Sequence, residues 1–474
     1  MGPMLLFRGR EGREWRLAAT MLQDGEAAPE PLLPEGGPPV EPMLLVRHRG
    51  RSFWRYDFAV TLETAPRRAH YAIGARRWPV ALPAADGPLR VAFTACNGTE
   101  GPDARPEEER NERWRHLAAR HDEAPFHLLL HGGDQIYADS LWRDIPELAA
   151  WWRLPRWRRV DAPLCGTTAE AVRDYFFMLY RKAWSDAEVS GPFAGIPSLM
   201  MWDDHDIVDG WGSHSAALQR SPVFQGVWRA ARESFALFQL GARPDGLPPG
   251  FARPDGGHFG WAYRVGHVGI LAPDLRSQRT KYRVMGETGW ADFLAGLDAI
   301  AGCRHLLLLS SVPAVHADPS PIERLLERLP FIQQHQDDLR DQWQSYAHHR
   351  EWHRLLRALL DFGRETGAGV TALSGEIHLG ALGRVRGRGA VLHQLISSGI
   401  VHPPPPWPVT AFFEWVTRRP RRLAKDLRME MLPLVDGRRR YLAARNWLEI
   451  ELPPDGGLQA VWYAEGREPL RFAA

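Results

Sequence analysis

The stretch Phe126-His-Leu-Leu-Leu-His-Gly-Gly-Asp-Gln-Ile-Tyr-Ala-Asp139 decides the fold, because it joins a buried strand to a turn rich in oxygen ligands. Residues 126–130 form a short, nearly continuous apolar run, which is typical of a strand buried on both faces. Asp134, Tyr137 and Asp139 follow within one turn. A turn that only capped a helix would need one such side chain, so the stretch predicts a ligand site at the end of a strand.

The same arrangement recurs at three other strand ends. Cys96 follows the apolar run 89–95, Asp203-Asp-His-Asp206 follows residues 198–202, and Gly375-Glu-Ile-His378 follows residues 370–374. Taken alone, Cys96 fits a buried small side chain and His378 fits a core histidine. Three acids in four residues, however, repel one another unless a cation or a histidinium balances them. Because open α/β sheets gather ligands at the carboxyl ends of their strands, the four strand ends together predict a metal site.

The pattern of apolar and polar residues along the chain changes near residue 88. Before it, short β segments separated by Pro- and Gly-rich stretches predict a small antiparallel β-sandwich module. After it, short apolar runs alternate with helix-like stretches, which indicates an α/β core whose sheet faces are covered. We therefore expect an N-terminal module over 1–87, a main domain over 88–474, helical insertions near 141–185 and 320–360, and a β-hairpin near 446–464.

Composition excludes several classes of protein. The 474 residues carry a formal net charge of only +2, so we expect neither nucleic acid nor a membrane as a partner. Cys96, Cys165 and Cys303 lie far apart without a CxxC pair, which favours a reducing compartment over a disulfide framework. The N-terminus lacks the pattern of a signal peptide, and no window reaches the roughly 18–20 apolar residues of a membrane span. We therefore expect a cytoplasmic protein.

Several short motifs occur in an order that is typical of one family. They are Ala95-Cys-Asn97, Gly133-Asp-Gln-Ile-Tyr-Ala-Asp139, Trp202-Asp-Asp-His-Asp206, Asp209-Gly-Trp-Gly-Ser213, Asp274-Leu-Arg276, Asp341-Gln-Trp343 and Ser374-Gly-Glu-Ile-His378. Together they resemble the PhoD-like (alkaline phosphatase D) branch of the calcineurin-like metallophosphatase superfamily. The resemblance implies an α/β (α+β) fold: a four-layer metallophosphatase-type β-sandwich flanked by helices, with an N-terminal small β-sandwich module.

The resemblance also implies the ligands of two metal ions. The residues that match the family's ferric ligands are Cys96, Asp134, Tyr137 and His378. Thiolate and phenolate are donors that Fe(III) favours, and Cys96 replaces the Asp-x-His motif of the wider superfamily. Asp134 matches the carboxylate that bridges to a second, oxygen-bound ion, which is calcium or another divalent ion. Asp204 matches an Asn ligand of the superfamily.

Four further residues take roles from the same resemblance. His205 matches the histidine beside the phosphate, Asp206 is expected to orient it, and Arg276 is a candidate phosphate clamp. Glu376 is a departure, because the family usually has Asp at this position. Its side chain is one methylene longer, so we expect it to reach the second ion directly, through water, or not at all.

The function implied by the resemblance is metal-dependent hydrolysis of a phosphomonoester or a phosphodiester. A hydroxide activated by two metal ions would attack phosphorus, and His205 would protonate the leaving oxygen as general acid. Two alternatives stay open at this point: a dinuclear-metal hydrolase of another ester class, and a non-catalytic metal-binding protein.

Overall fold

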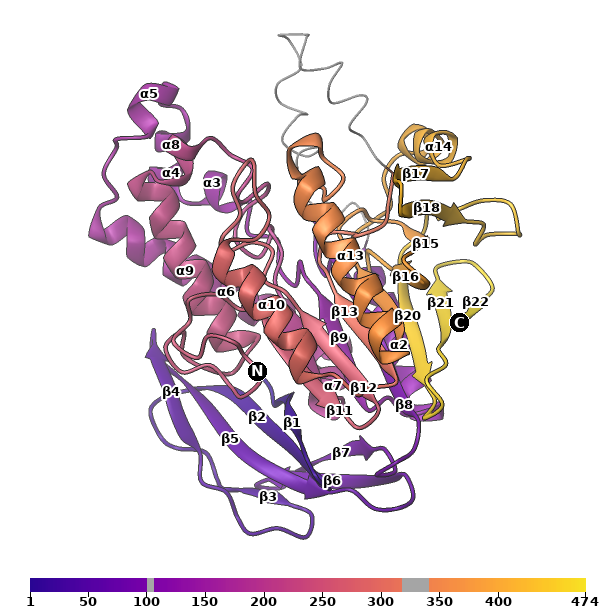
Figure 1. Ribbon diagram of the computed structural model, residues 1–474. Helices are drawn as coiled ribbons and strands as arrows, with labels where there is room; N and C mark the ends of the chain where they lie inside the picture. The colour runs from indigo at the N-terminus through magenta and orange to yellow at the C-terminus, as the bar shows by residue number, and fades with distance from the viewer. Residues whose placement is uncertain (100–105, 318–340) are drawn as a thin grey trace.

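The computed structural model describes residues 1–99, 106–317 and 341–474. Within them, two large β-sheets pack face to face, and helices cover their outer faces (Figure 1). The protein therefore has the four-layer α/β architecture that the motifs predict.

The first sheet has ten strands with a parallel centre. In order they are β22 (Leu470–Ala473), β21 (Gln459–Ala464), β20 (Asn446–Leu452), β8 (Leu89–Thr94), β9 (Leu128–Gly132), β10 (Ser198–Met201), β1 (Met4–Glu11), β2 (Glu14–Asp24), β5 (Arg51–Thr61) and β4 (Met43–His48). Because β8, β9 and β10 run parallel, their carboxyl ends lie at one edge of the sheet. β20 and β21 form an antiparallel hairpin where the sequence predicts one.

The N-terminal strands extend this sheet, since β1 pairs in parallel with β10 through Leu6 and Ser198. The other N-terminal strands form a small sheet in the order β3 (Leu32–Pro34), β6 (Arg67–Ile73) and β7 (Arg76–Leu82). The division of the chain at residue 87 stays a prediction.

The second sheet lies against the first. Its order is β11 (Trp261–Val265), β12 (Val268–Ala272), β13 (His305–Leu309), β14 (Gly369–Ser374), β16 (Ala390–Ile396), β15 (Gly380–Gly387), β18 (Leu427–Leu432) and β17 (Arg421–Ala424), with β19 (Tyr441–Leu442) paired to β15. Successive side chains of a strand point to opposite faces of its sheet, so the side chains of β13 contribute to two different cores. Leu307 and Leu309 pack between the sheets, whereas Leu306 and Leu308 pack under the outer helices.

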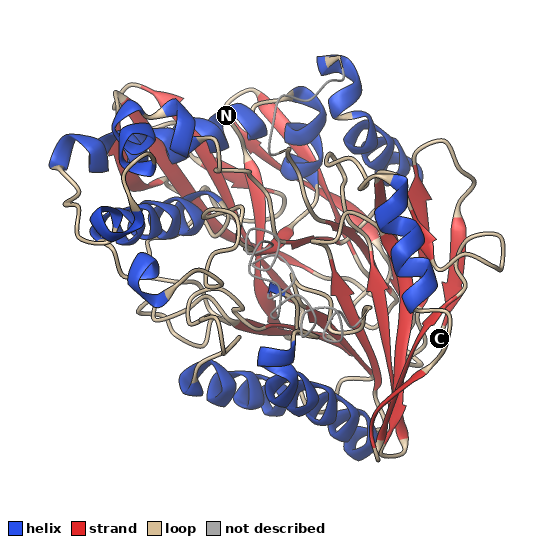
Figure 2. Cartoon of the chain, turned by 90° about the horizontal axis from the view of Figure 1, so that it is seen from above, coloured by secondary structure: helices blue, strands red, loops and turns tan. Residues whose placement is uncertain are grey.

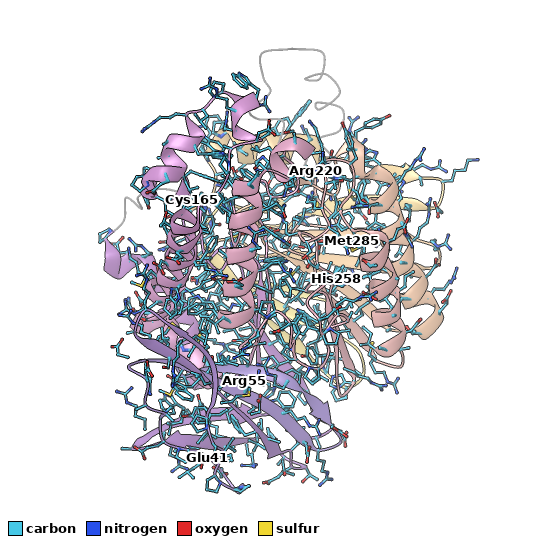
Figure 3. All side chains as sticks on the ribbon, turned by 90° about the vertical axis from the view of Figure 1, so that its left-hand side faces the viewer. Glu41, Arg55, Cys165, Arg220, His258 and Met285 are labelled. Carbon is cyan, nitrogen blue, oxygen red and sulfur yellow. The ribbon has the colours of Figure 1, made fainter. Side chains whose placement is uncertain are left out.

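Helices fill the outer layers. The outer core of the second sheet receives Trp290 from α10 (Glu287–Ala299) and Leu355 and Leu359 from α13 (His349–Thr366). The other helices among the described residues are α1 (Glu107–Arg110), α2 (Glu112–Glu123), α3 (Leu141–Asp144), α4 (Pro146–Trp152), α5 (Arg156–Arg159), α6 (Gly166–Trp184), α7 (Ala187–Gly195), α8 (Ala216–Gln219), α9 (Pro222–Phe238), α14 (Trp407–Val416) and the 3₁₀ helix η2 (Tyr346–His348). Figure 3 shows Cys165, just before α6, and Arg220, after α8, toward the end opposite Glu41.

The two predicted helical insertions have different outcomes. Helices α3 to α6 occupy the first, near residues 141–185. The second, near 320–360, lies partly outside the described residues, and its described part contains η2 and the first turns of α13.

Asn446 connects the C-terminal hairpin to a loop that follows β16. Its side chain accepts a hydrogen bond from the Ser397 hydroxyl at 2.6 Å and donates one to the Ser398 carbonyl at 3.0 Å. Asn446 is fully buried, so its loss would leave both loop groups without these partners.

We expect Asn446→Ala to lower the free energy of unfolding by about 1–3 kcal/mol, the cost of leaving buried polar groups unsatisfied. The urea midpoint measures the effect. Replacing Arg467, which is exposed, by Ala is the control and should change stability by less than about 0.5 kcal/mol. A midpoint that is equal in Asn446→Ala and wild type would contradict this role.

Candidate metal centre

Four strand ends meet at one edge of the sandwich. Cys96, Asp134 and Asp204 follow the parallel strands β8, β9 and β10 of the first sheet, and His378 follows β14 of the second. Figure 2 looks down on this end, where loops gather between the two sheets. The convergence predicted from the sequence is therefore present.

Asp134 belongs to two overlapping groups of metal-capable side chains. One group is Cys96, Asp134 and His378, and the other is Asp134, Asp204 and His205. Within each group the candidate ligand atoms lie within 4.8 Å of one another. A carboxylate shared by two groups is the arrangement that a pair of bridged ions requires.

The chemistry of the donors fits metal ions. Asp134 Oδ1 is buried and has no hydrogen-bond partner within the described residues. Burial, with a further contribution from Asp203, raises the pKa of Asp134 well above its usual value, so its ionised form needs a compensating cation. Burial likewise raises the pKa of the Cys96 thiol. Thiolate, imidazole and carboxylate together suit a transition metal.

The backbone beneath these side chains is unusual. Four non-glycine residues of the centre have positive φ: Cys96 (54°), Asp134 (56°), Glu376 (62°) and His378 (53°). Such conformations are uncommon outside glycine and gather at functional sites. Gly133, at φ 101°, allows the β9 loop to approach its neighbour, since a Cβ there would lie 2.7 Å from Asp203 Cβ.

Aromatic rings pack along one side of the centre. The Tyr137 hydroxyl lies 3.2 Å from His378 Nε2, and its ring stacks on His205 at a centroid distance of 4.3 Å. His402 stacks on His378 at 3.5 Å and on Tyr137 at 5.5 Å. The sequence interpretation missed His402, although it follows β16, a parallel neighbour of β14, so the same strand-end signal could have found it.

Asp139, rather than Asp206, orients His205. Asp139 Oδ2 lies 2.6 Å from His205 Nδ1, and its other oxygen accepts the Asp209 backbone N–H at 2.6 Å. Burial lowers the pKa of His205, but Asp139 and Asp204 outweigh it and raise that pKa well above its usual value.

The predicted role of Asp206 is therefore wrong. Its carboxylate accepts backbone N–H bonds from Asp134 at 2.9 Å, Gln135 at 3.1 Å, Ile136 at 3.4 Å and Asp203 at 2.9 Å, and a fifth bond from the Gln239 side chain at 2.9 Å. These contacts hold the β9 loop against the β10 loop, so Asp206 positions Asp134.

Arg276 is also placed differently from its prediction as a phosphate clamp. Its side chain is 0% exposed. Its donors contact Asp203, Asp204 at 3.3 Å and both oxygens of Asp341 at 2.8 and 2.6 Å. A guanidinium enclosed by three carboxylates balances their charge from inside the protein and is not available to a substrate.

Glu376 faces the pocket but belongs to neither three-residue group. Gln342 donates to Oε1 at 2.7 Å, while Oε2 is buried without a hydrogen-bond partner among the residues described. Burial raises the pKa of Glu376 to about 8. Its role as a ligand stays a prediction.

The centre opens into a cavity of about 370 Å³. Its polar wall includes Asp134, Asp204, His205, Glu376 and His378. Its apolar wall includes Val409 and Phe413 of α14. The cavity therefore places the candidate ligands against a surface that can accept an organic group.

The two groups predict different losses of metal on mutation. Because Asp134 is shared, Asp134→Ala should lose both equivalents, whereas Cys96→Ala should lose one. Elemental analysis of the purified proteins measures this. Cys303→Ala, a buried cysteine of the outer core, is the control and should retain the wild-type content. Equal metal content in wild type and Asp134→Ala would contradict the shared site.

Comparisons with known proteins support the fold and the family resemblance. The family model described as "PhoD related phosphatase" matches residues 108–330. The fold matches a structure entitled "Structure of PhoD", with a TM-score of 0.58, 12% identity, and coverage of 99% of this chain and 88% of the other. It also matches purple acid phosphatase PPD1 from yellow lupin (Lupinus luteus) seeds, with a TM-score of 0.58, 11% identity, and coverage of 99% and 73%.

A curated relative, Uncharacterized protein YGR266W of Saccharomyces cerevisiae, is 24% identical, and the match covers 73% of this chain. The chain spans 58% of the length of that relative. The similar structures establish the fold. The family match adds sequence evidence over residues 108–330, which contain β9, β10 and the loops that follow them. The resemblance predicted from the motifs is therefore supported: residues 108–330 match the PhoD-related phosphatase family model, and the fold of this chain is similar to that of PhoD.

Proposed function

We propose that this protein hydrolyses phosphate esters with two metal ions bound at the ends of β8, β9, β10 and β14. The single observation that carries the proposal is Asp134, a buried carboxylate shared by two groups of candidate ligands. One group contains the thiol of Cys96, and the other contains Asp204 and His205. Two cations held there would neutralise phosphate oxygens and supply a hydroxide nucleophile near neutral pH.

The other residues of the site have separate roles in binding and catalysis. Asp206 and Arg276 position the acidic loops, and the cavity wall formed by Val409 and Phe413 receives the organic part of the ester. His205, whose pKa Asp139 and Asp204 raise, faces the same cavity. Its Nδ1 is engaged by Asp139, so Nε2 delivers the proton to the departing oxygen.

The proposed first ion is Fe(III), held by Cys96, Asp134, Tyr137 and His378. Support comes from the donor types and from the contact between Tyr137 and His378. The proposed second ion is calcium or another divalent ion near Asp134, Asp204 and Glu376, where the donors are oxygens. Hydrolysis assays on an aryl phosphate monoester and diester, before and after chelation, test the function as a whole.

Leaving-group dependence identifies the role of His205. A general acid matters most for a poor leaving group. His205→Ala should therefore lose a factor of at least about 10² on an alkyl phosphate ester and much less on a p-nitrophenyl ester. Its metal content should stay at the wild-type level.

The matched variant is Asp134→Ala, which should depress hydrolysis of both esters together, because the nucleophile is lost. If His205→Ala slowed both esters equally or lost metal, His205 would act as a ligand and another group would have to protonate the leaving oxygen.

Colour tests the identity of the first ion. Thiolate and phenolate bound to Fe(III) should give a visible charge-transfer band. The band should weaken in Cys96→Ala and shift in Tyr137→Phe, and it should persist in Cys303→Ala. A colourless, iron-free and fully active enzyme would exclude the ferric assignment while leaving two-metal hydrolysis intact.

A further inference from the structure

Helix α14 is apolar, yet it packs poorly against the part of the chain that the structure describes. Its sequence is Trp407-Pro-Val-Thr-Ala-Phe-Phe-Glu-Trp-Val416, and none of its residues is buried by the described residues. Trp407 is 79% exposed, Trp415 68% and Phe412 37%. A soluble helix normally hides such side chains, and an exposed apolar patch rimmed by polar residues marks an interaction surface.

Positive charge follows directly after this helix. The exposed basic residues of the next turn and of β17 and its loop are Arg418, Arg419, Arg422 and Lys425. The nearby acid Glu414 is engaged, because it accepts the backbone N–H groups of Arg440 and Tyr441 at 2.7 and 2.9 Å. Aromatic and basic side chains therefore lie side by side on the surface of residues 407–425, which we call the α14 ridge.

A second surface has the same composition. Trp152 of α4 and Trp157 of α5 are exposed, and guanidinium groups lie over both rings: Arg159 over Trp152 at 5.0 Å and Arg158 over Trp157 at 4.8 Å. We call residues 146–159 the α5 ridge. Four tryptophans are exposed in the described part of the chain, and all four belong to these two ridges.

The ridges lie at one end of the molecule. Figure 1 shows α5 and α14 on opposite sides of the upper end, away from the small sheet of β3, β6 and β7. The α14 ridge also adjoins the metal centre, because Val409 and Phe413 of the same helix line its cavity. A flat partner that contacted both ridges would therefore face the end at which the strand-end loops gather.

We propose that the two ridges dock this end of the protein on an anionic membrane surface. Tryptophan and phenylalanine partition into the headgroup region, and arginine and lysine are attracted to anionic lipids. The net charge of +2 does not reveal this surface, because basic residues are concentrated on it. Docking is peripheral: among the helices described, none has the length and apolarity needed to cross a bilayer.

Vesicle sedimentation tests the proposal with the purified full-length protein. Vesicles of phosphatidylcholine are compared with vesicles in which one lipid in three is phosphatidylserine. The protein should sediment with the anionic vesicles at low salt and dissociate as salt is raised, since lipid charge is screened. Binding does not require catalysis, so the result is independent of the proposed hydrolytic activity.

Variants separate the two contributions. The Trp407→Ala, Trp415→Ala double variant should bind anionic vesicles at least about tenfold more weakly. Replacing Arg418, Arg419 and Arg422 by Gln should weaken binding about fivefold for each charge removed. The control carries Leu33→Ala and Arg76→Gln on the small sheet, where both positions are exposed, and should bind as wild type does. Thermal melting midpoints verify that every variant is folded.

Two results would overturn the proposal. One is wild-type protein that stays in solution with anionic vesicles at low salt. The other is vesicle binding that is unchanged in both ridge variants.

Discussion

Buried negative charge at the ends of β8, β9 and β10 is the constraint on which the rest of the structure depends. The candidate ligand atoms of Asp134 and Asp204 lie within 4.8 Å of each other, and burial together with the charge of Asp203 makes the ionised form of Asp134 costly. Arg276 balances part of this charge from inside the protein, through ion pairs with Asp203, Asp204 and Asp341. The charge that Arg276 does not reach lies on the cavity side, at Asp134, and this is where cations fit.

The fold brings the acidic residues together and holds them in place. Parallel strands bring three loops to one edge of the first sheet, and indole hydrogen bonds from Trp261 and Trp462 fasten the second sheet against it. The loops then adopt positive φ at four ligand or near-ligand positions, which the surrounding contacts must stabilise. Asp206 contributes by accepting hydrogen bonds from backbone N–H groups of both loops. Asn446 holds the loop that carries Ser398, whose hydroxyl contacts the sulfur of Cys96.

The sequence predicted the fold class and the convergence of the candidate ligands because both follow from local patterns. Apolar runs mark buried strands, and a chemically unusual residue after each run marks a strand end. The partners of individual charges could not be read in this way. His205 neighbours Asp206 in sequence but bonds Asp139, and Arg276 lies inside the acidic cluster rather than in the cavity. Such choices depend on how loops from different strands pack, and sequence adjacency does not encode them.

The central claim is that Asp134 joins two metal ions, and a crystal structure of the metal-loaded protein with anomalous scattering tests it most directly. We expect two anomalous peaks roughly 3.5–4 Å apart, with one oxygen of Asp134 directed at each ion and Cys96 on one ion only. A single peak, or two ions that do not share Asp134, would contradict the account.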